Sequence, residues 1–186
     1  MELFEAIRRR HSYRGPMSSE PVSREDLRQI VQAGMQAPSG RNAQTTEFVM
    51  IDDVGILAQL HALHPANKAM QQAPAMIACL VDRSPEKTYE GYDFQLEDCA
   101  AAVENMLLAI TALGYASVWI DGWLRLQNRE AVVAQLLRLP AGKKVQVLLP
   151  VGRPEEVWPQ KERRPFNERA WFNSYRPDAP SCPEGD

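Results

Sequence analysis

The stretch DCAAAVENMLLAITALG, residues 98–114, decides how this chain folds. Nearly all of its positions are small or apolar, so a helix formed here is apolar around most of its circumference. Such a helix must be covered on more than one side, and a second subunit would cover it more readily than one short chain. Gly114 stands where a left-handed residue commonly ends a helix. The stretch therefore predicts a long central helix with a defined C-terminal end.

Further helices and strands are predicted on both sides of this central helix. Ser23, followed by two acidic residues, has the pattern of a helix N-terminus, and Pro38 ends that helix. Residues 75–81 are apolar at consecutive positions, as in a strand that is buried on both faces. Hydrophobic spacing predicts the remaining elements: helices at 2–9, 56–63 and 128–137, and strands at 47–51, 117–120 and 144–151.

Length and charge limit what this protein can be. A chain of 186 residues is long enough for one good core, so we expect a single domain over residues 1–176 and a disordered tail over 177–186. The net charge of −3 provides no general attraction for nucleic acid. No segment has the ~20 apolar residues of a membrane span, and none resembles a signal peptide. We therefore expect a cytoplasmic protein with no membrane partner.

The cysteines and histidines do not predict a metal site. Cys79, Cys99 and Cys182 are scattered and odd in number, which is typical of reduced thiols. His61 and His64 are one helical turn apart and could hold a metal, but no cysteine or acidic ligand lies nearby in the sequence. An exposed helix end before a proline is the better interpretation of this pair.

Two basic clusters lie near opposite ends of the chain. The first is the run Arg10-His11-Ser12-Tyr13-Arg14, and the second contains Lys161, Arg163 and Arg164. Guanidinium groups and a hydroxyl can bind a phosphate, because they offer charge-assisted hydrogen bonds. Either cluster alone could equally be a solvated basic surface. If the two clusters converge in space, they form one anion site.

Composition changes abruptly after Gly152. Residues 153–176 are rich in Pro, Arg and Glu, and they include five large aromatic residues without helical or strand spacing. Aromatic side chains in such an arm need a surface to pack against. The arm could fold back on its own domain or cross to another subunit.

Four motifs follow one another in an order that resembles the flavin-dependent nitroreductase family. These motifs are the opening run 10–14, Pro38-Ser39 with Asn42 and Gln44, the run from residue 98 through Gly114 to Gly122, and Lys161-Glu162-Arg163-Arg164-Pro165. The similarity covers residues 2 to about 170. The chain departs from it at Thr45-Thr46, where relatives commonly have Pro-Trp, and at Trp119, where many have proline.

The resemblance implies a fold and an assembly. The fold is α+β, with three α/β/α layers and a central mixed, mostly antiparallel sheet flanked by helices. The assembly is an intertwined homodimer with FMN at the subunit interface, and the extended arm 153–176 of each chain adds to its partner.

The resemblance also implies an activity. We expect hydride transfer from NADH or NADPH through bound FMN to a small electron-poor acceptor, which is a nitroaromatic, a quinone or a flavin. No GxGxxG motif occurs among the ten glycines, so the dinucleotide is a transient visitor and the kinetics are ping-pong. The alternative is a flavin-binding protein without turnover, which acts as a carrier, a sensor or an interaction partner.

Site residues follow from matching these motifs to the needs of FMN. The phosphate is assigned to Arg10, His11, Ser12, Lys161 and Arg163. The ring edge is assigned to Arg14 and Asn42, with Pro38, Ser39 and Gln44 as further cofactor contacts and Asn67 and Lys68 as additional candidates that could equally form a polar turn. Asp121 and Gly122, preceded by Trp119 and Ile120, are assigned to the reactive flavin N5 and to catalysis, with an exposed turn as the alternative for Asp121.

Overall fold

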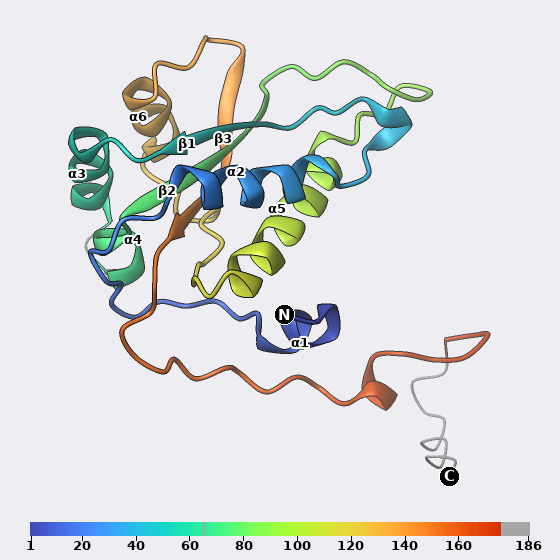
Figure 1. The fold of residues 1–186 in the computed structure, drawn as a ribbon. Coiled ribbons are helices and arrows are strands. Elements are labelled where there is room, and N and C mark those ends of the chain that lie inside the picture. The colour runs from blue at the N-terminus through green and yellow to red at the C-terminus, as the bar shows by residue number, and fades with distance from the viewer. Residues whose placement is uncertain (65, 176–186) are drawn as a thin grey trace.

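The computed structural model describes residues 1–64 and 66–175. Its strands β1 (Glu47–Ile51), β2 (Ala75–Asp82) and β3 (Lys143–Val151) form one sheet in the order β1-β2-β3, and both pairings are antiparallel (Figure 1). The α-helices are α1 (Leu3–Arg9), α2 (Arg24–Met35), α3 (Val54–Leu63), α4 (Lys68–Gln72), α5 (Gln95–Ala112) and α6 (Arg129–Leu136). Short 3₁₀ helices lie at Gly40–Asn42 and Phe166–Glu168.

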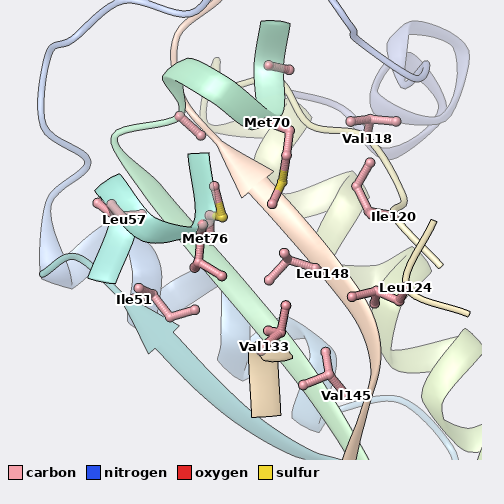
Figure 2. Packing of buried hydrophobic residues seen from close by; sticks show 14 of the residues in the cluster. Ile51, Leu57, Met70, Met76, Val118, Ile120, Leu124, Val133, Val145 and Leu148 are labelled. Atoms are coloured by element: carbon pink, nitrogen blue, oxygen red, sulfur yellow. The ribbon is translucent and has the colours of Figure 1, made fainter. Parts of the chain in front are cut away.

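The central strand β2 explains why helices cover both faces of the sheet. All of its residues except the last are buried, as the run of apolar positions predicts. Successive side chains point to opposite faces, so the even-numbered residues 76–80 pack with α3, α4 and α6, and the odd-numbered residues 75–81 pack with α2 and α5. Figure 2 shows the first cluster, in which Leu57 and Val133 lie with Met76 and Leu148 of the sheet. The structure therefore has three layers, and the predicted α+β class is confirmed.

Helix α2 begins at its predicted cap. The Ser23 hydroxyl accepts a hydrogen bond of 3.0 Å from the Asp26 backbone N–H. The helix packs its apolar side, which includes Leu27 and Ile30, against α5. This packing fixes the position of the loop that follows α2.

We predict that Ser23→Ala lowers the free energy of unfolding by about 1 kcal/mol, because the Asp26 N–H loses its cap. Urea denaturation monitored by circular dichroism measures the change. Ser19→Ala is the matched control, since Ser19 is exposed and lies outside any helix. Equal stability of the two variants would contradict the capping role.

The long helix α5 starts three residues before its predicted start. The buried Gln95 side chain accepts from the Asp82 N–H at 2.9 Å and donates to the Asp82 carbonyl at 3.1 Å, which ties the new helix to the end of β2. At the other end, Gly114 has φ +80°. The Tyr115 N–H bonds to the Ile110 carbonyl at 3.0 Å, as in a Schellman motif, so the predicted glycine cap is confirmed.

The predicted strand at residues 117–120 is wrong as a continuous element. The segment runs antiparallel to β3, but only two isolated bridges form, between Ala116 and Gly152 and between Ile120 and Leu148. The register places Val118 opposite a proline between them. Pro150 has no N–H to donate, so the ladder is interrupted at that position. Helix α4 is an element that the sequence pattern did not predict.

The two ends of the chain leave apolar surface uncovered. Leu3, Phe4 and Ile7 of α1 form the predicted apolar face, but all three are exposed. After Gly152 the chain passes α1 and then extends away from the domain (Figure 1). Trp158 packs edge-on against Tyr13, whereas Phe166 and Phe172 are exposed.

None of the described helices combines the length and the apolar character that crossing a bilayer requires. The predicted tail 177–186, with Cys182, lies outside the described residues.

Candidate functional site

A cavity of about 250 Å³ lies beneath the opening run, between the C-terminal half of α5 and the start of the arm. Arg10 and His11 line it from one side, Leu107 and Ile110 from α5, and residues 156–158 from the arm. The beginning of the chain and the segment after the last strand therefore meet at one concave surface.

Arg10 supplies a fixed positive charge to this cavity. It follows the last residue of α1, and its backbone N–H bonds to the Ala6 carbonyl at 2.8 Å. The Nε atom lies 3.2 Å from Oε1 of Glu104 on α5, and only 18% of the side chain is exposed. A guanidinium has five N–H donors, so this single contact leaves several donors for a ligand.

Two polar atoms at the cavity lack a hydrogen-bond partner among the described residues. The buried Ser117 hydroxyl is one, and His11 Nε2 is the other. His11 Nδ1 lies 2.8 Å from the Arg9 carbonyl, which can only accept, so Nδ1 donates this hydrogen bond and Nε2 is left without a partner. Buried polar groups are normally paired, so these two atoms point to a polar ligand.

Ser12 and Arg14 lie on the other side of the same extended segment. Tyr13 between them is buried, and its N–H bonds to the Ser117 carbonyl at 2.9 Å. Ser12 is half-buried, and Arg14 is exposed with Nη1 3.4 Å from the Ser12 carbonyl. Alternation in an extended segment puts Ser12 and Arg14 on the face opposite His11 and Tyr13, and neither Ser12 nor Arg14 lines the cavity, whereas Arg10 at the end of α1 does.

The basic residues of the arm do not line this cavity in the described structure. Lys161, Arg163 and Arg164 are all exposed. The arm residues that reach the opening run are instead Glu156 and Trp158.

A second group of predicted site residues lies in loop 38–44, which follows α2. The Ser39 hydroxyl accepts from the Gln44 N–H at 3.0 Å, and the Asn42 N–H bonds to the Ser39 carbonyl at 2.9 Å. Pro38, Asn42 and Gln44 are exposed, so the two amide side chains face outward from a bonded turn. The loop borders a cavity of about 120 Å³ against the N-terminal part of α5.

The turn at Asp121-Gly122 follows the bridge of Ile120 to β3. The Asp121 carboxylate forms two hydrogen bonds with Arg125, at 2.6 and 2.7 Å. Its side chain is thus paired with Arg125, and the backbone is the part of this turn that can meet a ligand. Ile120 packs in the hydrophobic cluster on one face of the sheet, and Trp119 packs against the cluster on the other face. These contacts fix the chain just before the turn.

The Asn67-Lys68 pair begins α4. The buried Asn67 side chain caps this helix by accepting from the Met70 N–H at 3.2 Å, while Lys68 is exposed. A local structural role therefore accounts for the Asn67 amide oxygen.

The sequence suggested that His61 and His64 lie at an exposed helix end. Both side chains are instead half-buried. His61 Nε2 lies 3.0 Å from the Ala73 carbonyl, and His64 stacks on Trp123 with ring centroids 4.8 Å apart. Burial and, to a smaller extent, the charge of Arg129 lower the pKa of His64. In the described part of the chain, no three metal-ligating side chains gather into a site.

Sequence reasoning missed several neighbours of the predicted site residues. Glu104 and Ser117 are examples, and each is a polar residue within an otherwise apolar stretch, which is the signal that could have identified it. Trp123 gave no such signal, because its contact with His64 depends on the tertiary structure.

Comparisons with known proteins agree with this architecture. The profile of the nitroreductase family matches residues 7–153. A protein of Archaeoglobus fulgidus, assigned as an NADH dehydrogenase/NAD(P)H nitroreductase, is 32% identical over 155 residues, which are 83% of this chain and 87% of that protein.

Solved structures have the same fold. A protein of Desulfovibrio desulfuricans, assigned as a nitroreductase and solved in complex with FMN, has a TM-score of 0.77 at 30% identity and covers 95% of this chain and 99% of that one. A protein of Parabacteroides distasonis, assigned as an NADH dehydrogenase/NAD(P)H nitroreductase, has a TM-score of 0.78 at 26% identity, with 93% and 98% covered. The family profile, the relative and the structures agree, so this chain belongs to the nitroreductase family.

Proposed function

We propose that this protein is an NAD(P)H-dependent oxidoreductase that uses FMN to reduce a small electron-poor acceptor. Relatives carry names that include NAD(P)H nitroreductase, and one was solved with FMN. The structural observation that carries the proposal is the cavity beneath the opening run, where the Arg10 guanidinium meets two unpaired polar atoms. The Arg10 guanidinium and the Ser117 hydroxyl can donate charge-assisted and hydroxyl hydrogen bonds to a phosphate and its ester chain.

In this proposal, different residues of the chain bind different parts of FMN. Arg10 and His11 line the cavity at the phosphate end, and Ser12, Lys161 and Arg163, which do not line it in the described structure, join them when the cofactor is bound. Arg14 and the loop amides of Asn42 and Gln44 bind the ring edge, where a fixed cation favours the reduced flavin. Backbone N–H groups of Asp121-Gly122 lie beside the reacting atom without crowding it. When bound, FMN accepts a hydride from NAD(P)H and passes reducing equivalents to the acceptor.

A homodimer completes the site in this proposal. The cavity beneath the opening run and the one beside loop 38–44 share no lining residue, and they border successive parts of α5, with Ala102 at the wall of one and Leu107 at the wall of the other. A two-fold axis could bring the loop of one subunit to the opening run of the other, because the same patches then meet twice. The exposed apolar faces of α1 and the arm would be covered at such an interface. Light scattering should give twice the mass of one chain.

The purified protein tests the function directly. We expect a yellow protein that NADH or NADPH bleaches without oxygen, and that a nitroarene or a quinone then reoxidises. A yellow protein that is not bleached would indicate a flavin-binding protein without turnover. A colourless protein that cannot be reconstituted with FMN would overturn the proposal.

We predict ping-pong kinetics, because no dinucleotide-binding motif is present and the donor must leave before the acceptor enters. Initial rates at several fixed NAD(P)H concentrations should give parallel double-reciprocal lines. Intersecting lines would show that donor and acceptor occupy the enzyme together, and would exclude alternating use of one site.

A further inference from the structure

Loop 38–44 is held in an unfavourable backbone conformation. Arg41, Asn42 and Gln44 all have positive φ, at 52°, 56° and 51°. Residues with a Cβ atom rarely adopt this left-handed region, so three such residues within four positions need support from the surrounding structure. The support must come from bonds that close the loop on both sides.

Asp98 on the first turns of α5 makes such bonds. Its Oδ1 accepts a 2.8 Å hydrogen bond from the Gly40 N–H, and its Oδ2 accepts another of 2.8 Å from the Thr45 hydroxyl. These two partners stand on either side of residues 41–44. Only 7% of Asp98 is exposed, so water competes little for the carboxylate, and its place near the N-terminus of α5 favours the negative charge.

Phe94 completes the support one helical turn earlier. A Cβ atom at Gly40 would lie 2.5 Å from Cδ2 of Phe94, so the loop backbone rests directly on this ring. Phe94 and Asp98 are four residues apart and therefore share one side of the helix. The helix thus provides both a surface and two hydrogen-bond acceptors for the loop.

We propose that Asp98 is a positioning residue for flavin binding: it holds loop 38–44 in the bound shape before the cofactor arrives. This inference rests on the proposed function, in which the amides of Asn42 and Gln44 meet the flavin ring edge. A loop that is already ordered does not lose conformational entropy on binding, and affinity rises accordingly. Asp98 itself touches no cofactor in this scheme.

The test compares Asp98→Leu with Asp98→Asn. Leucine removes both acceptors at similar size, whereas asparagine still accepts from the Gly40 N–H and can donate to the Thr45 hydroxyl, which is able to accept. We expect the FMN dissociation constant to rise about tenfold in Asp98→Leu and to stay within about threefold of the native value in Asp98→Asn. Riboflavin binding should weaken by the same factor as FMN binding, since the loop acts on the ring and not on the phosphate.

Glu97→Leu is the matched control. Glu97 is the exposed neighbour of Asp98 on the same helix, and its replacement makes the same change in charge. Native affinity in Glu97→Leu together with weakened affinity in Asp98→Leu supports the positioning role. Equal affinities in Asp98→Leu and the native protein overturn it.

Hydrogen exchange in the protein without FMN separates this inference from the proposed function. The backbone amides of Gly40 and Gln44 should exchange at least about tenfold faster in Asp98→Leu and at near-native rates in Asp98→Asn. If the native protein binds no FMN, the proposed function fails, and unchanged exchange would independently show that Asp98 does not hold the loop.

A second pair of variants covers the case in which Asp98→Leu does not fold. Thr45→Val removes one of the two bonds and leaves the carboxylate in place, whereas Thr45→Ser keeps the hydroxyl. Faster exchange of the loop amides and weaker FMN binding in Thr45→Val alone support the inference. Identical behaviour of the two Thr45 variants overturns it.

Discussion

Replacing Arg10 with alanine is expected to weaken FMN binding about 100-fold, equivalent to about 2.7 kcal/mol. The side chain is largely buried at the cavity, and Glu104 already fixes its orientation. The variant loses a preorganised cation and leaves the Glu104 carboxylate unpaired beside the proposed phosphate position. Both changes disfavour a dianionic phosphate.

Riboflavin identifies which part of the cofactor Arg10 binds. Riboflavin lacks the phosphate, so its dissociation constant should change less than about threefold in Arg10→Ala. Arg10→Lys keeps the charge but not the planar fork, and we expect an intermediate loss of about tenfold for FMN. Fluorescence titration of the protein without FMN measures all of these constants.

Arg8→Ala is the control for net charge. Arg8 is exposed on α1 and does not line the cavity, yet its removal changes the charge by the same amount. If Arg8→Ala and Arg10→Ala weaken FMN binding equally, the loss of affinity is a general electrostatic effect. The assignment of the phosphate to this cavity is then incorrect.

Local patterns predicted most of the fold. The bounds of β1 match the predicted 47–51, and the consecutive apolar residues of β2 correctly indicated a strand with helices on both faces. Ser23 and Gly114 were recognisable because caps depend on a few neighbouring residues. Each of these features depends on residues that are close together in the sequence, so local patterns were enough to predict it.

The errors have causes that lie elsewhere in the chain. The interruption at residues 117–120 comes from Pro150, a residue of the neighbouring strand, and not from the segment itself. The early start of α5 depends on Gln95 bonding to the end of β2. A local pattern contains no information about such partners, so it predicts the element but not its limits.

The sequence could predict which residues belong to the candidate site, but not how they are arranged in space. The motifs identified loop 38–44, but the buried carboxylate that shapes the loop lies 58 residues after Gly40. The sequence also suggested that Lys161 and Arg163 meet the opening run, whereas the described arm brings Glu156 and Trp158 there. The basic residues of the arm are exposed and lie outside any helix or strand, so no local pattern indicates where they lie.

Replacing Gly122 with alanine is expected to slow flavin reduction by NAD(P)H about 100-fold while FMN stays bound. Gly122 is exposed, and no described atom lies within 4 Å of an added Cβ. Its φ lies outside the left-handed region, so alanine fits the backbone, and stability should change by less than about 0.5 kcal/mol. A methyl group in this open space therefore meets only what binds there. A displacement of about 1 Å between the reacting atoms is enough for a loss of this size.

Gly142→Ala separates this effect from any general cost of losing a glycine. Gly142 precedes β3, and an added Cβ there also meets no described atom within 4 Å. Anaerobic stopped-flow absorbance at saturating NAD(P)H measures the single reduction step, and the FMN absorbance of each variant reports occupancy. We expect native rates in Gly142→Ala and slow reduction in Gly122→Ala. Native reduction rates in both variants would place hydride transfer away from this turn, and the Asp121-Gly122 backbone would then be a structural feature of the chain and not part of the reacting site.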